Sequence, residues 1–181
     1  YQSKLKTYMG AGHKPDDLRE SAHSSIKQIK QRLLILQKES GQDGELSKFI
    51  EQMNDKAYFF QYADELMKNY RQSMHQINKQ TPTLFSDFPK ATYQLTTIDD
   101  LMAAKSPALY YQLNHIEGLM IGSLKINSAR LLLHPKWQVK ASLLKYGAPG
   151  YHFLHAMHEE LNKLPPFRDD LDTRAFELGW G

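Results

Sequence analysis

The sequence lacks cysteine entirely over its 181 residues. Disulfides, thiolate zinc sites and a cysteine nucleophile are therefore excluded within this chain, and cysteine usage does not reveal its redox compartment. A chain of this length can bury a core without such cross-links. We therefore expect a single folded segment over 1–181, belonging to one domain.

The sequence also lacks a large excess of charge of one sign, and it has no long apolar run. The 23 Lys and Arg residues are scattered among 20 Asp and Glu residues, and the net charge is only +3. Nucleic acid is therefore not expected as a partner, because its binding requires a basic patch or stripe. No apolar run approaches the roughly 18 residues of a membrane span, and the start does not resemble a signal peptide. We expect no membrane span in this chain.

The chain begins at Tyr1 without methionine and ends abruptly at ELGWG. We interpret it as an internal or processed piece of a longer protein. Some apolar faces are then expected to be covered by the remainder of its own chain or by another chain. The candidates are the run from Leu33 to Leu36 and the last turn at Trp180.

Apolar spacing predicts a mainly α-helical fold with a small antiparallel β-hairpin or sheet. The first part, about 1–80, is expected to be helical, with one long helix from Pro15 to the SGQDG sequence, a short helix from Leu46 and a third around 66–77. In the long helix the apolar residues recur every three or four positions, which predicts packing into a core. They are Leu18, Ala22, Ile26, Ile29, Leu33 and Leu36.

The middle part, 81–130, is expected to hold a proline-bearing loop and a hairpin. Thr97, with Asp100 three residues later, predicts the cap of a short helix at TTIDDLMAA. The segments PALYYQL and LMIGSLKIN predict two strands that are joined across NHIEG, where Gly118 suits the turn.

The last part, 131–181, is expected to contain a kinked helix and a closing helix. In the stretch LLKYGAPGYHFLHAMHEEL, Pro149 cannot donate to the helical ladder and its ring crowds the preceding turn. Two helical pieces are therefore expected, at about 135–147 and 150–163, with a bend between Gly147 and Gly150.

The order of five blocks carries a resemblance to a known family. FFQYADELMKNYRQ, LFSDFPKATYQL, SPALYYQL, APGYHFLHAMHEELNKLPPF and RAFELGW resemble, over essentially the whole chain, the bacterial domain-of-unknown-function family 885. Members of that family look like helical zinc-dependent peptidases, and exported and lipid-anchored proteins occur among them. The resemblance implies a peptidase-like helical fold and a periplasmic or envelope location.

The family's motif His-Glu-x-x-Pro-Gly-His-His kinks the active-site helix so that histidines on both sides face one metal. Aligned on Pro149-Gly150, this chain has Lys145 at the first His, Tyr146 at the catalytic Glu and Tyr151 at the next His. The second of the two paired histidines is retained as His152. A lysine is a poor zinc ligand because its ammonium must first lose a proton. The resemblance thus implies a degenerate metal site with no catalytic residues.

The family also has Glu-Gly-Trp near the end of this region. Aligned on Gly179-Trp180, Leu178 stands at the position of that Glu, while Glu177 comes one residue earlier, rotated by about 100° on a helix. A rearranged zinc site from His152, His155 and Glu177 is an alternative, although these residues match no known ligand spacing. The simpler interpretation makes His158 solvated and pairs His155 with Glu159, and it needs no cofactor.

Other positions that match the family look like walls of its cleft and are candidates for a ligand pocket. They are Tyr110, Tyr111, Asn127, His152, Glu177 and Trp180. Tyrosines that alternate on a strand and a terminal tryptophan can equally serve packing alone.

Two main hypotheses follow, and a third stays open. The leading hypothesis is a catalytically inactive, peptidase-like binding or scaffold domain of an exported bacterial protein or lipoprotein, with a peptide as its ligand. The alternative is a metal-dependent peptidase or hydrolase with a rearranged site or with residues outside this chain. A purely structural, helical interaction protein is the third.

A final expectation concerns the charge of the lost metal. Burying a carboxylate in a cleft without a cation costs free energy. We therefore expect Lys145 to replace the metal charge beside Glu177. Tyr146 and Tyr151 would then fill the vacated space.

Overall fold

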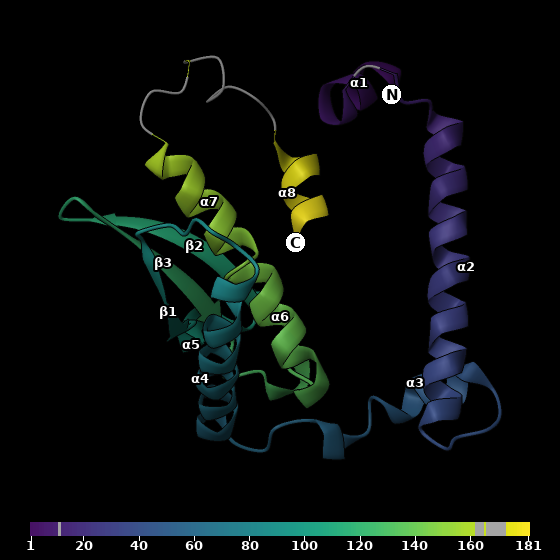
Figure 1. Cartoon of the computed structure of the whole chain (residues 1–181). Coiled ribbons are helices and arrows are strands. Elements are labelled where there is room, and N and C mark those ends of the chain that lie inside the picture. Colours follow the sequence, from purple (N-terminus) through teal and green to yellow (C-terminus); the bar gives the residue numbers. More distant parts are fainter. Residues whose placement is uncertain (11, 162–164, 166–172) are drawn as a thin grey trace. The chain divides into compact units, whose positions relative to one another are not determined.

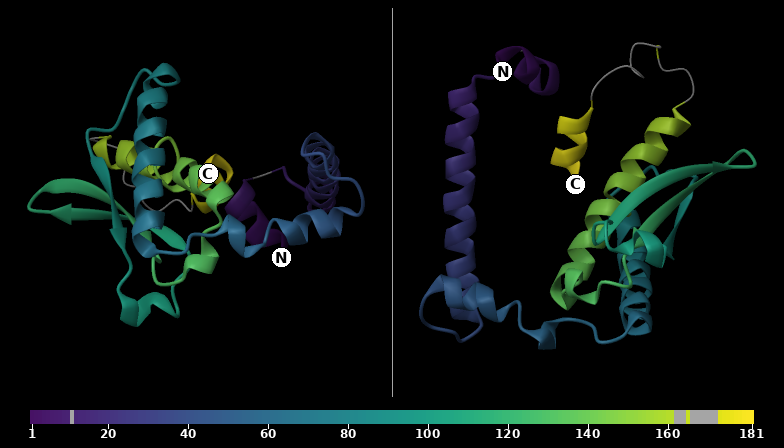
Figure 2. Two further views of the ribbon diagram at one scale, coloured as in Figure 1. Left: turned by 90° about the horizontal axis from the view of Figure 1, so that it is seen from below. Right: turned by 180° about the vertical axis from the view of Figure 1, so that it is seen from behind.

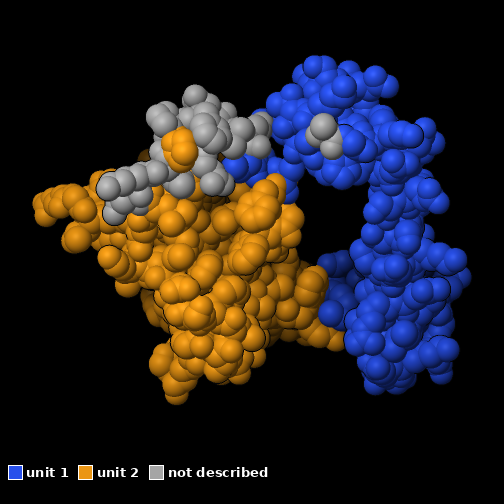
Figure 3. Space-filling model, turned by 45° about the horizontal axis from the view of Figure 1, so that its top comes forward, with its two compact units in different colours: residues 1–55, 172–175 blue, residues 56–171, 176–181 orange. Residues whose placement is uncertain are grey.

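A computed structural model describes residues 1–10, 12–161, 165 and 173–181 (Figure 1). Contacts divide the chain into two compact units (Figure 3), and each is described by itself. The first unit contains residues 1–55 and 172–175, and the second contains residues 56–171 and 176–181. No helix in the described residues is both long and apolar enough to cross a membrane.

The first unit is built from helices α1, α2 and α3. Their bounds are Gln2–Met9, Pro15–Glu39 and Leu46–Gln52. Helix α2 begins with proline at its first position and two aspartates in its first turn, and Lys38 lies in its last turn, all favourable for those helix ends. The Gln37 side chain donates to the Gly44 carbonyl over 3.2 Å and so holds the turn into α3.

The apolar stripe of α2 does not form a core, contrary to the sequence-based expectation. Ile29 is 59% exposed, and Ile26 and Leu36 are also exposed. Gln37 is the one buried residue of this 25-residue helix. The physical reason is that the first unit offers α2 no sheet or helix of comparable length to pack against. The run from Leu33 to Leu36 is largely exposed as well.

The second unit combines helices with a three-stranded sheet. Its strands are β1 Thr92–Thr97, β2 Leu109–Ile116 and β3 Leu119–Ile126. Its main helices are α4 Ala63–Gln80, α5 Asp100–Ala103, α6 Val139–Tyr146 and α7 Tyr151–Glu160, while α8 Arg174–Trp180 crosses the boundary between the units. Short 3-10 helices lie at Lys56–Tyr58, Thr81–Thr83, Leu131–Leu133 and Lys136–Gln138.

The sheet has the order β1-β3-β2, with β2 antiparallel and β1 parallel to β3. The predicted hairpin is confirmed. Its turn places Glu117 at φ 50° and Gly118 at φ 80°, a two-residue turn that matches the twist of the strands. The tip of the hairpin projects beyond the helices (Figures 1 and 2).

Two local expectations in the middle part were wrong. Residues 92–95, expected in the loop, and residues 96–97, expected at the start of the short helix, form strand β1 instead. Pairing with β3 supplies backbone hydrogen-bond partners that the local sequence does not reveal. Thr97 therefore belongs to a strand, and α5 is capped by Asp99, whose carboxylate accepts from the Leu101 amide over 2.8 Å.

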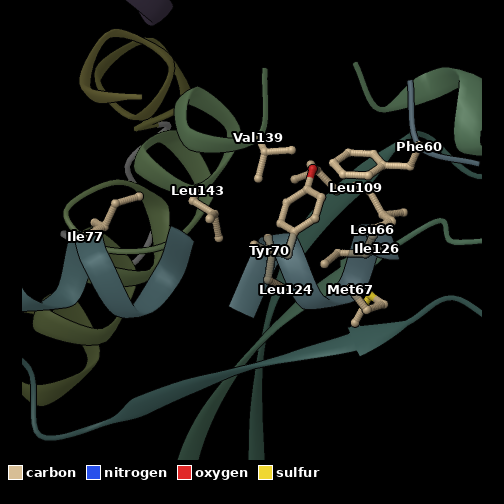
Figure 4. Packing of buried hydrophobic residues seen from close by; sticks show 10 residues of the cluster. All are labelled: Phe60, Leu66, Met67, Tyr70, Ile77, Leu109, Leu124, Ile126, Val139 and Leu143. Atoms are coloured by element: carbon tan, nitrogen blue, oxygen red, sulfur yellow. The ribbon is translucent and has the colours of Figure 1, made fainter. Parts of the chain in front are cut away.

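The core of the second unit lies between α4, α6 and the sheet (Figure 4). Helix α4 contributes Leu66 and Tyr70, α6 contributes Val139 and Leu143, and β3 contributes Leu124, all of them essentially buried. This packing holds α6 against α4 up to the point where the helix breaks.

The predicted break is confirmed. Helix α6 ends at Tyr146 and α7 begins at Tyr151, after a cis Ala148–Pro149 peptide bond. The first piece starts at Val139 after a 3-10 turn, four residues later than predicted. The second piece ends at Glu160, and the predicted end at 163 lies outside the described residues. Gly150 is required here, since a Cβ would lie 1.9 Å from the Lys145 carbonyl oxygen.

Candidate ligand site at the helix break

Lys145, Tyr146 and Tyr151 form one cluster at the break between α6 and α7. The ammonium of Lys145 lies 5.6 Å from the centroid of the Tyr146 ring and 5.9 Å from that of Tyr151. The two tyrosine rings meet edge to face with centroids 5.3 Å apart. All three side chains are half-buried. Such an arrangement stabilises a cation through the faces of aromatic rings.

His152 is 2% exposed, and both of its ring nitrogens are engaged. Nε2 lies 3.1 Å from the Ala91 carbonyl oxygen, and Nδ1 lies 3.1 Å from the Tyr111 hydroxyl. A carbonyl can only accept, so Nε2 carries the proton. Nδ1 therefore accepts the Tyr111 hydroxyl proton.

The protonation states of this pair follow from burial. Burial lowers the pKa of His152 below its ordinary 6.5, although donation to Ala91 and the nearby Glu160 carboxylate act in the opposite direction. Burial also raises the pKa of the Tyr111 hydroxyl far above its ordinary value. A neutral imidazole therefore faces a neutral phenol at neutral pH.

His155 links this pair to the end of the chain. Its ring stacks on Tyr111 with centroids 5.8 Å apart and planes 13° apart, and its Nε2 lies 3.9 Å from a Glu177 carboxylate oxygen. The expected pairing of His155 with Glu159 is therefore replaced by one with Glu177. His158 is exposed, in agreement with its interpretation as a solvated side chain.

Lys145 and His152 are poorly suited to bind zinc together. A zinc ligand must offer a lone pair, but Nδ1 of His152 already accepts the Tyr111 hydroxyl proton and Lys145 offers an ammonium. Within residues 1–10, 12–161, 165 and 173–181, no group of three or more His, Asp or Glu side chains lies where it could hold a metal ion.

The remaining candidate pocket residues are distributed unevenly around the break. The Trp180 indole donates to the Pro149 carbonyl over 2.7 Å and its ring stacks on Phe153, so it closes one side of the bend. Leu178 is 65% exposed. Tyr110 is half-buried on β2 and pairs in register with Lys125.

Asn127 belongs to a different network. It is fully buried, and its amide nitrogen donates to the carbonyls of Ala103, Ser106 and Pro107 over 2.8–3.3 Å. These bonds fix the loop before β2. The structure thus brings Asn127 together with that loop and not with the cluster at the break.

Sequence reasoning missed Glu160 and the loop that it holds. The Glu160 carboxylate accepts from the backbone amides of Lys90 and Ala91 over 2.9 and 2.8 Å. His152 holds the carbonyl of the same Ala91. The helical spacing puts the side chains of His152 and Glu160 on one broad side of α7, about 80° apart. No local sequence pattern predicts that the loop at Lys90 and Ala91 packs against this helix.

Glycine also shapes the site, on the sheet side. A Cβ at Gly122 would lie 2.6 Å from Nδ1 of His152 and 2.9 Å from Cβ of Tyr93. A pocket of about 340 Å³ adjoins His152 and Tyr93, and Asn78, Phe88 and Phe153 also line it. The break is therefore flanked by a half-open space with mainly apolar walls.

A comparison with protein families settles the membership of this chain. The family described as "Bacterial protein of unknown function (DUF885)" matches residues 1–181. The chain belongs to the DUF885 family. No curated protein matches this DUF885 chain.

A solved structure shares its fold. The protein described as "the putative lipoprotein from Colwellia psychrerythraea" superposes on this DUF885 chain with a TM-score of 0.89 and 17% sequence identity. The match covers 99% of this chain and 32% of the Colwellia protein. The DUF885 chain thus spans about a third of the length of that protein, and at this identity the likeness concerns the fold alone.

Proposed function

We propose that this DUF885 chain is a catalytically inactive, peptidase-like binding domain whose ligand is a peptide. The observation that carries the proposal is the Lys145 ammonium between the rings of Tyr146 and Tyr151, at three positions where the resembling motif has a metal ligand, a general base and a second ligand. Hydrolysis by a zinc peptidase needs all of these groups together. The engaged nitrogens of His152 support the same proposal.

A second candidate is a metal-dependent hydrolase with a rearranged site. One contact favours it, since the Nε2 atom of His155 lies 3.9 Å from Glu177 and so brings together two of its three proposed ligands. His152 would have to give up its bond to Tyr111 to complete the set.

Metal analysis of the purified protein separates the two candidates. After dialysis against zinc we expect less than stoichiometric metal, together with no hydrolysis of a casein digest. Stoichiometric zinc that is abolished by His152→Ala or His155→Ala, but kept by the exposed control His158→Ala, would establish the hydrolase instead.

We also propose an envelope location, supported by the fold shared with a protein described as a lipoprotein. Fractionation of the producing cells tests this point. Recovery of the protein with cytoplasmic markers alone would contradict it.

A further inference from the structure

The ammonium of Lys145 has no carboxylate partner among the residues that the structure describes. The sequence favoured Glu177 as that partner, but the Glu177 carboxylate lies against His155. A half-buried cation without a counter-charge is costly, because burial removes part of its hydration. The two tyrosine rings offset this cost only in part.

The cluster has unused hydrogen-bond donors. The hydroxyls of Tyr146 and Tyr151 make no hydrogen bond to another described residue, and neither does the Lys145 ammonium. Ammonium and hydroxyl groups all donate, so the cluster is matched to an acceptor with several lone pairs. A carboxylate offers two oxygens and the missing negative charge, and hydrogen bonds between charged groups are the strong ones.

Space for the rest of such a ligand lies beside the cluster. Tyr146 also lines a cavity of about 140 Å³, whose other walls include Ser142, Gln138 and His134. Of these walls, Gln138 carries an amide that suits the peptide unit next to a terminal carboxylate, whereas both ring nitrogens of His134 are engaged by Tyr70 and by the Asn127 carbonyl.

We propose that Lys145, Tyr146 and Tyr151 bind the C-terminal carboxylate of a peptide at the break between α6 and α7. This inference rests on the proposed function and names the ligand group that the same site recognises. A lysine in place of a metal keeps the positive charge that attracts an oxygen anion but activates no water. Binding can therefore persist where hydrolysis is lost.

The test compares a free acid with its amide. Acetyl-Ala-Ala-Ala and acetyl-Ala-Ala-Tyr are titrated into the protein by calorimetry at low ionic strength, each with a free carboxylate and as the C-terminal amide. We expect at least one acid to bind roughly tenfold or more tightly than its amide, which is the range for a hydrogen bond to a charged group. Equal affinity of acid and amide in both pairs overturns the inference.

Variants assign the effect to the cluster. The preference for the acid should disappear in Lys145→Met and persist in Lys140→Met, an exposed lysine on the same helix. Lys145→Arg keeps the charge and should retain a preference, which provides a second test if the methionine variant folds poorly by circular dichroism. A preference that survives Lys145→Met in folded protein overturns the assignment.

Two further measurements, competition by acetate and zinc analysis, distinguish this inference from the proposed function. If sodium acetate displaces the tripeptide acid at a similar concentration, the carboxylate site stands and its ligand is a small organic acid. Stoichiometric zinc would overturn the proposed function whatever the peptides do. If the unsubstituted protein binds no zinc, hydrolyses nothing and shows no preference for the acid over the amide, this inference is overturned while the proposed function stands.

Discussion

Gly122 sits in β3 at the one place where His152, Tyr93 and Tyr111 all approach the strand. Its missing side chain leaves room for the imidazole, so the polar pair of His152 and Tyr111 depends on a residue that has no side chain. At the scale of single residues, the geometry of the site therefore depends on close packing as much as on hydrogen bonding.

We expect Gly122→Ala to destabilise the fold by about 1–3 kcal/mol, because the new Cβ would overlap the His152 ring. Urea unfolding followed by circular dichroism measures the change. Gly179→Ala is the matched control, since a Cβ there meets nothing within 4 Å, and it should be close to neutral. Equal stabilities of the two variants would contradict this account of the packing.

The buried His152 should also make stability depend on pH. Burial lowers its pKa in the folded state below the ordinary 6.5, so the unfolded chain binds the proton more readily. Stability contributed by the neutral imidazole is complete above about pH 6.5 and is lost as the pH falls below it. His134, another buried histidine with a lowered pKa, acts in the same direction.

We therefore expect the free energy of unfolding to fall between pH 7.5 and 5.5, and to fall less steeply in His152→Gln. Urea midpoints at half-unit steps of pH measure both slopes. The exposed His158→Gln should keep the slope of the unsubstituted protein. Identical slopes in all three proteins would show that His152 is not responsible.

Helix α7 organises the site at the scale of elements. Through His152 and Glu160 it holds both the carbonyl and the amide of Ala91, and through the break it meets α6. The loop before β1 is thereby attached to the helix that carries Tyr151 and His152. Changes at the Glu160 end of this helix should reach the pocket wall at Ala91 without touching the Lys145 cluster.

Glu160→Gln tests this attachment. We expect a loss of about 1 kcal/mol, because a partly exposed carboxylate that accepts two backbone amides is replaced by a neutral side chain. The exchange of the Lys90 and Ala91 amide protons should become faster at the same time. Glu159→Gln, its exposed neighbour, should change neither quantity.

The break itself depends on Gly150. A Cβ at this position would lie 1.9 Å from the Lys145 carbonyl oxygen and 2.3 Å from that of Leu144, both of them backbone atoms. We expect Gly150→Ala to cost about 3 kcal/mol or more, and to weaken any ligand binding at Lys145. Thermal unfolding measures the cost, and a change below 1 kcal/mol would mean that α6 and α7 can separate freely.

At the scale of the whole molecule, the two units differ in how they hold apolar residues. The second unit has a packed core around Leu66 and Leu124, whereas α2 in the first unit exposes most of its apolar stripe. The expectation that another part of a longer chain or another protein covers this stripe stays a prediction.

The contrast predicts opposite responses to substitution. Leu66→Ala should destabilise the protein by about 2–5 kcal/mol, because it opens a cavity at a residue with no exposed surface. Ile29→Gln should change stability by less than about 0.5 kcal/mol. Denaturant unfolding measures both, and a large loss for Ile29→Gln would show that α2 is buried in solution.

The sequence alone was sufficient for features that depend on neighbours along the chain. Helical spacing located α2 and α4, proline and glycine located the break, and the Gly118 turn located the hairpin. The block order also pointed to the DUF885 family. These features follow from backbone preference and side-chain period, which act over a few residues.

Only the tertiary structure decided the partners of these elements. It made residues 92–97 a strand, placed Glu177 against His155, and left the Lys145 ammonium between two rings with no carboxylate partner among the described residues. It also showed that the α2 stripe is exposed. Sequence periodicity tells which face of an element is apolar or charged, but the group that meets that face comes from a distant segment, and its identity depends on how the segments pack.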